Sequence, residues 1–351
     1  MIERIESEEF LNRTNYLPVL DVRSPKEFMQ GHIPGAENLP LFNDEERAIV
    51  GTIYKNSGRE AAILKGLEFT GPKLAEFVKK LIRIAPKKEI LLHCWRGGIR
   101  SEQMALLFDL AGFKIGVLIG GYKSYRKFIR NDLSRMAQII ILGGLTGSGK
   151  TETLHALRDR GEQILDLEEI AHHKGSVFGA IGQEPQPTNE QFENNLYSQW
   201  VKFDFSKIIW VENESRMIGN ITIPEPLFEQ MTKAEIFVHE VPREQRILRL
   251  IEAYSQFEKE ELKTGIMKIA EKLGGTRTKQ ALIAVENNDF ITAAGITLDY
   301  YDKTYYFAIS KRINNILFTL SSLEIDPVEI AGHILLKMQQ LNRTSPPYRV
   351  G

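Results

Sequence analysis

The stretch Ile139-Ile140-Ile141-Leu142-Gly143-Gly144-Leu145-Thr146-Gly147-Ser148-Gly149-Lys150-Thr151 decides the fold of the second half of this chain. An apolar run typical of a buried strand leads directly into a glycine-rich loop, and the helical pattern of Glu152–Asp159 follows. This order of strand, loop and helix is the context in which such a loop binds phosphate, whereas a chance glycine turn has no such context. The backbone amides would wrap a diphosphate, Lys150 would neutralise its oxygens, and the Thr151 hydroxyl would be a ligand of Mg²⁺. We predict a diphosphate-binding loop formed by Gly144, Thr146, Gly147, Ser148, Gly149, Lys150 and Thr151.

A second loop contains the only cysteine of the chain, in the stretch His93-Cys94-Trp95-Arg96-Gly97-Gly98-Ile99-Arg100. It lies between a predicted strand, Ile90–His93, and a predicted helix, Ser101–Ala111, so that backbone amides and the helix N-terminus converge on the sulfur and stabilise a thiolate. The two glycines let successive amides point inward, and the arginines supply positive charge. We predict that Cys94 is catalytic and that Arg96, Gly97, Gly98, Ile99 and Arg100 hold an oxyanion. The alternative is an inert buried cysteine at a strand end.

Apolar runs and helical stretches alternate along the whole chain, which predicts α/β architecture with parallel sheets. At 351 residues the chain is long enough for two domains, and apolar strands restart after Ser134–Gln138. We predict a first domain over 1–135 with the cysteine loop, and a second over 136–351 with the phosphate-binding loop and a helical C-terminal region. Further strands are expected at Leu17–Val22, Gly116–Ile119, Ile164–Leu167, Lys207–Val211 and Ile236–His239.

Composition limits the function and the location. The net charge of −1 argues against a protein that coats nucleic acid, although residues 1–135 hold 22 basic and 17 acidic residues. A basic stretch that follows the cysteine loop suits an RNA backbone or, alternatively, forms a solvated helix face; it consists of Lys123, Arg126, Lys127, Arg130 and Arg135. The chain has no membrane-length apolar run and no signal-peptide pattern at its start, so we expect a cytoplasmic protein.

Acidic residues end two of the predicted strands of the second domain, as the pairs Asp166 with Glu168 and Glu212 with Glu214. Carboxylates at this edge of a parallel sheet lie on the ligand side. We predict that Asp166 and Glu212 join Thr151 around Mg²⁺; the alternative is that they are solvated strand ends.

The cysteine domain resembles the rhodanese family. The matching stretches are Asp21-Val22-Arg23-Ser24-Pro25-Lys26-Glu27-Phe28, Gly31-His32-Ile33-Pro34-Gly35-Ala36, Asn38-Leu39-Pro40 and Gly120-Gly121-Tyr122. Five residues separate the cysteine from Arg100, one more than in the common sulfurtransferase loop, which makes a wider cradle. The same His-Cys-x5-Arg spacing is found in cysteine phosphatases. A sulfurtransferase or phosphatase fused to an NTPase or kinase domain is therefore the alternative enzyme, and a regulatory scaffold is the alternative without activity.

The two loops together resemble the tRNA 2-selenouridine synthase family. The matching stretches are Asn43-Asp44-Glu45-Glu46-Arg47, Val50-Gly51-Thr52 with Tyr54-Lys55 and Gly66, Asp166-Leu167-Glu168, His173 to Gly179, Glu212 to Gly219 and Tyr300-Tyr301-Asp302 with Tyr305. The resemblance implies a transferase that alkylates wobble 2-thiouridine with geranyl diphosphate and then replaces the geranylated sulfur with selenium from selenophosphate. Its implied partner is the anticodon arm of tRNA; Mg²⁺ is the implied cofactor and ATP is not needed.

Some residues of these stretches have either a substrate role or a structural one. Asp21 and Arg23 belong to the rhodanese-like signature, and Gly66 lies in an apolar stretch where it would end a helix. Tyr300 and Tyr301 could stack on anticodon bases or wall a geranyl pocket, or pack in the core.

Overall fold

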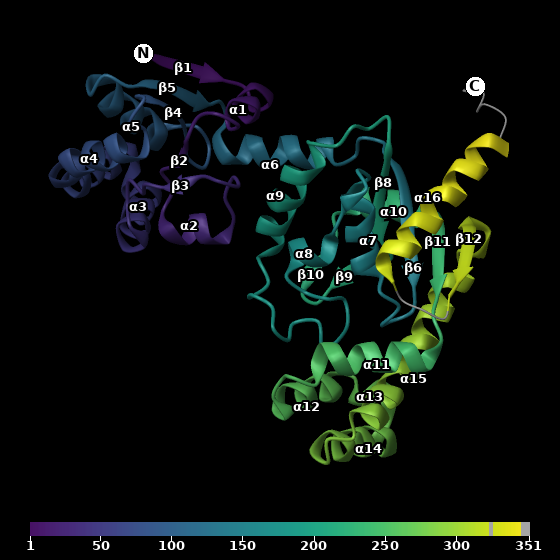
Figure 1. Cartoon of the computed structure of the whole chain (residues 1–351). Helices are drawn as coiled ribbons and strands as arrows, with labels where there is room; N and C mark the ends of the chain where they lie inside the picture. The colour runs from purple at the N-terminus through teal and green to yellow at the C-terminus, as the bar shows by residue number, and fades with distance from the viewer. Residues whose placement is uncertain (323–325, 345–351) are drawn as a thin grey trace. The chain divides into compact units, whose positions relative to one another are not determined.

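The computed structural model describes residues 1–322 and 326–344, and the chain forms two compact units (Figure 1). The first unit holds Met1–Ser134 together with Thr188–Ser198, and the second holds Arg135–Pro187 and the described residues from 199 onward. The division predicted at residue 135 therefore misses one segment of the first unit. The reason is tertiary: Asn194 donates a hydrogen bond of 2.8 Å to the backbone of His32.

The first unit is built on a five-stranded parallel sheet with the order β1-β5-β4-β2-β3. The strands are β1 (Ile2–Ile5), β2 (Val19–Asp21), β3 (Glu37–Asn38), β4 (Glu89–His93) and β5 (Lys114–Leu118). The helices are α1 (Ser7–Arg13), α2 (Pro25–Gln30), α3 (Asp44–Thr70), α4 (Leu74–Ile84), α5 (Ile99–Leu110), α6 (Gly121–Asp132) and α9 (Asn189–Trp200), with a 3₁₀ turn η1 (Gly71–Lys73). Strands β2, β4 and β5 confirm the three strands predicted here.

Burial explains why these segments read as continuous apolar runs. Ile90, Leu91 and Leu92 of β4 are all buried, because helices cover both faces of a parallel sheet. Phe108 of α5 is fully buried against the same core. The core thus fixes the C-terminal end of β4, where the cysteine loop begins.

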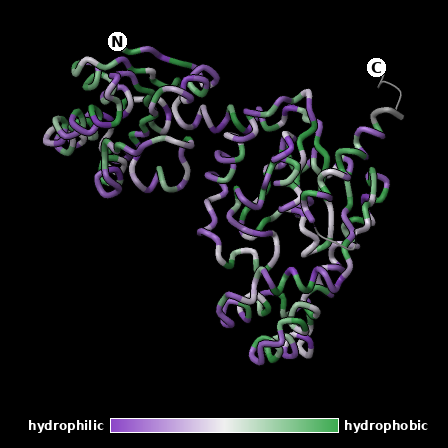
Figure 2. The backbone as a smooth tube through the Cα atoms, viewed as in Figure 1, coloured by the Kyte–Doolittle hydropathy of each residue, from purple (hydrophilic) through white to green (hydrophobic). Residues whose placement is uncertain are grey.

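The second unit is built on another five-stranded parallel sheet, with the order β12-β11-β6-β8-β7. Its strands are β6 (Gln138–Gly144), β7 (Gln163–Leu165), β8 (Ile208–Glu212), β11 (Glu235–Glu240) and β12 (Ile316–Ser321), and β9 (Met217–Ile218) and β10 (Ile221–Thr222) form a separate antiparallel pair. The apolar strand β6 lies at the centre of the sheet and is green in Figure 2. The predicted strand Ile164–Leu167 was too long, because Asp166 caps a helix that begins at Leu167.

Helices surround this sheet and extend into a helical region. They are α7 (Lys150–Asp159), α8 (Leu167–Ala171), α10 (Glu225–Lys233), α11 (Arg243–Tyr254), α12 (Lys259–Lys268), α13 (Ala270–Leu273), α14 (Gly275–Glu286), α15 (Phe290–Ser310) and α16 (Pro327–Thr344), with a 3₁₀ turn η2 (Ile313–Asn315). Helices α11 to α15 pack on one another around their own apolar cluster (Figure 1). Among the described helices, none combines the length and apolar character needed to cross a membrane.

Candidate active site

The cysteine loop joins the end of β4 to the start of α5, as its sequence predicts. Gly97 has a φ of +66° and Gly121, at the start of α6, has a φ of +59°. A Cβ atom at Gly121 would lie 2.4 Å from the carbonyl oxygen of Cys94, so only glycine allows this approach. The amide of Tyr122 donates to the same carbonyl at 2.8 Å. The start of α6 therefore packs directly on the cysteine loop and holds it in place. Gly121 was not predicted to have this role, although the pair Gly120-Gly121 after β5 is a signal for such a close approach.

Cys94 lies at the base of this loop and is only 3% exposed. Its Sγ atom is 3.2 Å from the hydroxyl of Ser101, which also donates to the carbonyl of Gly98 at 3.0 Å. Either the hydroxyl or the thiol can donate in this contact, so Ser101 holds the sulfur in place at the base of the loop. Ser101 was not among the predicted site residues. The sequence does place its hydroxyl in the first turn of the helix that follows the cysteine loop, and this position could have identified it.

The two arginines of the loop differ in their surroundings. Arg100 is bound in two places to Glu27 of α2, at 2.6 and 3.2 Å. Burial is the largest influence on the pKa of the Glu27 carboxyl and raises it. The hydrogen bond and charge of Arg100, together with the amide of Ser24 and the charge of Arg47, outweigh burial and hold that pKa below its usual range. Arg96 is exposed and, among the described residues, makes no ion pair. Of the two side chains, Arg96 is therefore the one whose charge is available to an incoming anion.

Asp21 and Arg23 lie beneath the loop in the scaffold of the first unit. Both are fully buried, and the Arg23 guanidinium contacts Asp21 at 2.5 Å and the carbonyl of Gly31 at 2.7 Å. The centre of the guanidinium stacks 3.8 Å from the ring of Tyr122. Burial lowers the pKa of the neighbouring His93, so at neutral pH Arg23 supplies the positive charge beside Asp21. Of the two roles left open for Asp21 and Arg23, the structure supports the structural one.

The basic stretch after the loop is largely used within the first unit. Arg126 is buried, donates to the carbonyl of Glu190 at 3.1 Å and pairs with Glu193 and Asn194 of α9. Arg130 also pairs with Glu193, at 2.8 Å. Lys123 and Lys127 remain exposed, so the cationic surface available there is smaller than the sequence suggests.

Gly66 does not end a helix. It lies inside α3, which runs to Thr70, and a Cβ atom there would be 3.2 Å from the ring of Phe42. The glycine allows helix and phenylalanine to approach closely, which is a packing role.

The phosphate-binding loop joins β6 to α7 in the predicted order. Gly147 and Gly149 have φ values of +81° and +83°, and the ammonium group of Lys150 donates to the carbonyl of Gly144 at 3.0 Å. Ser148 is fully buried, and its hydroxyl has no hydrogen-bond partner within the described part of the chain. The loop thus has the curled, glycine-dependent backbone that is expected of a phosphate-binding loop.

A buried arginine supports this loop from α11. Arg246 donates to the carbonyl of Thr146 at 3.2 Å and binds both carboxylate oxygens of Asp302, on α15, at 2.8 Å each. A Cβ atom at Gly147 would lie 3.0 Å from the carbonyl oxygen of Arg246. Nothing in the sequence indicated that Arg246 contacts Thr146 and Asp302, because these residues are far apart along the chain.

Three carboxylates gather beside Thr151. Ligand atoms of Glu168, Glu212 and Glu214 all lie within 4.8 Å of one another, and the Thr151 hydroxyl donates to Glu168 at 3.2 Å. Burial and the neighbouring charge of Glu214 raise the pKa of Glu168 to about 8, and burial and Glu168 raise that of Glu212. Neither carboxylate oxygen of Glu212 has a hydrogen-bond partner among the described residues. A buried oxygen-rich cluster of like charges fits a hard divalent cation such as Mg²⁺.

Asp166 belongs to a different group from the one predicted. Its carboxylate binds His155 Nε2 at 2.7 Å and caps α8 through the amide of Glu169 at 2.8 Å. Glu168, two residues after Asp166, is the carboxylate that lies beside Thr151. Glu212 does lie in the acidic cluster, so the structure favours Glu168, Glu212 and Glu214 with Thr151 as the set that would hold a cation.

Tyr300 and Tyr301 both lie in the helical region of the second unit. The hydroxyl of Tyr301 accepts a hydrogen bond of 2.7 Å from the amide of Val177, and burial raises its pKa. Tyr300 packs against the apolar cluster of α12 and α14. Tyr301 therefore holds the loop that follows α8, and both residues have a packing role.

Comparisons with known proteins agree with this arrangement. A family model for the tRNA 2-selenouridine synthase AAA domain matches residues 137–328, and one for the rhodanese-like domain matches residues 5–128. Three proteins named tRNA 2-selenouridine synthase are similar to the chain. The protein of Shewanella piezotolerans is 36% identical over 86% of this chain and 91% of its own length. That of Bdellovibrio bacteriovorus is 32% identical over 90% and 81%. That of Nitrosomonas europaea is 37% identical over 68% of this chain and 63% of its own length.

One solved structure, the N-terminal domain of a putative ATP/GTP binding protein from Clostridium difficile 630, is 36% identical and covers 36% of this chain and 98% of that chain, with a TM-score of 0.34. The two family models match the two compact units in the same order along the chain. The chain therefore belongs to the tRNA 2-selenouridine synthase family.

Proposed function

We propose that this protein converts 2-thiouridine at the wobble position of tRNA into 2-selenouridine through an S-geranylated intermediate, with geranyl diphosphate and selenophosphate as co-substrates. The names of its relatives support the tRNA modification. One structural observation carries the finer proposal: the chain combines a cysteine in an anion-binding loop with a separate diphosphate loop beside an acidic cluster. Two anionic co-substrates of different chemistry need two such loops.

The first step belongs to the phosphate-binding loop. The thiocarbonyl sulfur of the nucleoside attacks the first carbon of the geranyl group, and the bond from that carbon to the diphosphate oxygen breaks. The loop amides and Lys150 stabilise the charge that develops on the departing diphosphate. Mg²⁺ held by Thr151 and the acidic cluster would add charge neutralisation to the same leaving group. Because the diphosphate ester supplies the leaving group, ATP has no role in this step.

The second step belongs to the cysteine loop. S-alkylation makes the sulfur a good leaving group. The selenium of selenophosphate bonds to the same ring carbon while the carbon–sulfur bond breaks and geranyl thiolate departs. Water then cleaves the phosphorus–selenium bond, which releases inorganic phosphate and leaves 2-selenouridine. The loop amides and the exposed Arg96 bind the phosphate part of selenophosphate. Cys94, with Ser101 beside its sulfur, faces the selenium donor from the base of the loop.

The surroundings of the cysteine argue against the alternative of a phosphatase. A cysteine phosphatase needs a carboxylic acid that protonates the leaving group. Glu27 is bound to Arg100 and Asp21 is buried against Arg23, and the pKa of each carboxyl is lowered. Neither acid keeps the proton that general-acid catalysis requires at neutral pH.

The test is mass spectrometry of nucleosides from tRNA that carries 2-thiouridine, incubated with the protein, geranyl diphosphate and Mg²⁺, with and without selenophosphate. We expect a geranylated nucleoside in the first reaction and 2-selenouridine in the second. Unchanged 2-thiouridine in both reactions with folded protein would refute the proposal, and phosphate release from simple esters would then support the phosphatase.

A further inference from the structure

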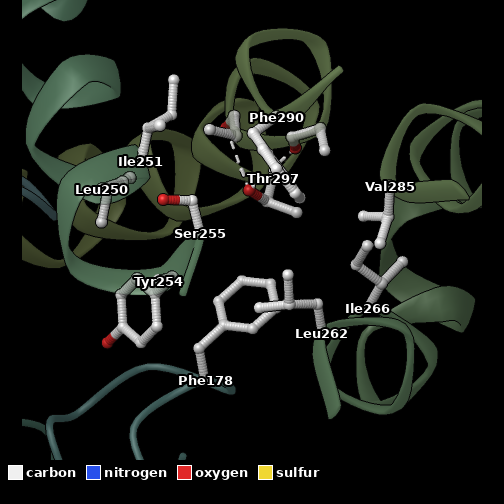
Figure 3. A pocket seen from close by; sticks show the side chains of 12 residues that line it. Phe178, Leu250, Ile251, Tyr254, Ser255, Leu262, Ile266, Val285, Phe290 and Thr297 are labelled. Carbon is white, nitrogen blue, oxygen red and sulfur yellow. Dashed lines mark hydrogen bonds between the residues drawn. The ribbon is translucent and has the colours of Figure 1, made fainter. Parts of the chain in front are cut away.

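An apolar pocket lies in the helical region of the second unit, among α11, α12, α14 and α15 (Figure 3). One wall consists of the rings of Phe178 and Tyr254, whose centres are 5.7 Å apart, and Leu262, Ala294 and Thr297 form other walls. Neither the cysteine loop nor the acidic cluster contributes a side chain to it.

The pocket shares two structural elements with the phosphate-binding loop. Helix α11 touches the loop, since a Cβ atom at Gly147 would lie 3.3 Å from Leu250 Cγ, and Leu250 also lines the pocket. The second element is the segment after α8. A Cβ atom at Gly175 would lie 2.5 Å from Glu168, whereas Phe178, three residues later, points into the pocket. Diphosphate loop, acidic cluster and pocket are thus joined by direct contacts within one unit.

Tyr254 marks the boundary between the pocket and the acidic cluster. Its ring lines the pocket, and its hydroxyl lies near Ser176, Glu168 and Glu152. Burial raises the pKa of this phenol, and the charges of Glu168 and Glu152 raise it further. One side chain therefore has an apolar face toward the pocket and a polar end toward the acids beside the phosphate-binding loop.

The lining selects the chemical class of the occupant. None of the described lining residues carries a charge, and the Thr297 hydroxyl is already satisfied by the carbonyls of Ala293 and Ala294 at 3.1 and 2.9 Å. A nucleoside base placed here would lose hydrogen bonds to water without replacement, which is unfavourable. A hydrocarbon chain loses nothing and gains from leaving water.

We propose that this pocket binds the terpenyl chain of a prenyl diphosphate whose diphosphate occupies the phosphate-binding loop. The inference rests on the proposed function, because it assigns a site to the geranyl group of that reaction. It makes Phe178, Tyr254 and the residues of α15 at the pocket specificity determinants for chain length. Each buried methylene group is worth about fourfold in affinity. Geranyl diphosphate should accordingly bind up to about a thousandfold more tightly than the dimethylallyl ester, which has five fewer carbons.

The experiment measures binding to the full chain by isothermal titration calorimetry with Mg²⁺ present. The three probes are inorganic pyrophosphate, dimethylallyl diphosphate and geranyl diphosphate. Ala294→Phe fills the pocket from α15, and Ala308→Phe introduces the same ring at an exposed position of the same helix. We expect Ala294→Phe to weaken binding of geranyl diphosphate at least tenfold and to leave inorganic pyrophosphate unaffected. Ala308→Phe should change neither affinity.

The outcomes separate the two proposals. If wild-type protein binds geranyl diphosphate tightly and Ala294→Phe binds it equally well, the pocket assignment is wrong while the proposed function stands. If wild-type protein binds geranyl diphosphate no better than pyrophosphate, the terpenyl chain contributes nothing to affinity. The pocket assignment is then wrong, and no variant is needed to show it. A wild-type protein that binds none of the three probes would refute the geranylation step itself. Unchanged pyrophosphate binding by Ala294→Phe reports that the variant is folded.

Discussion

Replacing Asp302 with asparagine should destabilise the second unit far more than the same change at Asp299, although both residues lie on α15 and pair with arginines of α11. Asp302 binds Arg246, whose side chain is 3% exposed, whereas Asp299 binds Arg243 and Arg277, which are 44% and 50% exposed. Removal of one partner from a buried ion pair costs about 3–5 kcal/mol, because the remaining charge is left uncompensated. Exposed pairs contribute only about 0–1 kcal/mol.

The Asp302 side chain is 19% exposed, so we place the cost of Asp302→Asn at the lower end, about 3 kcal/mol. In a domain of this size each kcal/mol shifts the melting temperature by about 2–4 °C, so the expected loss is about 6–12 °C. Asp299→Asn should lower it by no more than about 4 °C. Because Arg246 also holds the carbonyl of Thr146, Asp302→Asn should weaken binding of pyrophosphate as well. Differential scanning calorimetry tests the first effect and titration calorimetry the second. Equal melting temperatures for the two variants would refute the reasoning.

Two further predictions concern the chemistry of the loops. Cys94→Ser should block selenation and leave geranylation largely intact, whereas Lys150→Ala should slow geranylation. Nucleoside mass spectrometry measures both steps. Equal loss of both steps in a folded Cys94→Ser protein would contradict the assignment of selenation to the cysteine loop and geranylation to the phosphate-binding loop. The second prediction concerns pH. The pKa of Glu168 is raised in the folded protein to about 8, so its contribution to stability is present below pH 4.5 and is lost as the pH rises through 8. Without Mg²⁺ the melting temperature should therefore fall between pH 6 and 9, and the stabilisation by added Mg²⁺ should increase over that range as protons leave the carboxylates. Glu168→Gln should flatten both trends; a stabilisation by Mg²⁺ that is independent of pH would contradict the assignment of the cation site.

Local sequence predicted the features that are formed by residues close together along the chain. Cys94 to Arg100 and Gly144 to Thr151 each lie between an apolar strand and a helix, so a short segment defines both the backbone and the ligand-binding groups. The central strands of both sheets were predictable for the same reason, since buried parallel strands are continuous apolar runs. The ends of strands depend on more than the apolar run. The strand predicted at Ile164–Leu167 is the edge strand β7, and it ends at Leu165 because Asp166 caps the helix that follows.

The other features depend on residues that only the folded chain brings together. Asp166 and Glu168 are equally plausible cation ligands along the sequence, and the choice depends on which one α8 turns toward Thr151. Arg246 and Asp302 meet because α11 and α15 pack, and Thr188–Ser198 joins the first unit through the partners of Arg126. The sequence by itself thus determined the two loops, the α/β class and the family resemblance, because these depend on short-range patterns. Tertiary structure alone decided the cation-binding set, the support of the phosphate-binding loop and the apolar pocket, because burial and pairing between distant segments arise only when helices and sheets pack.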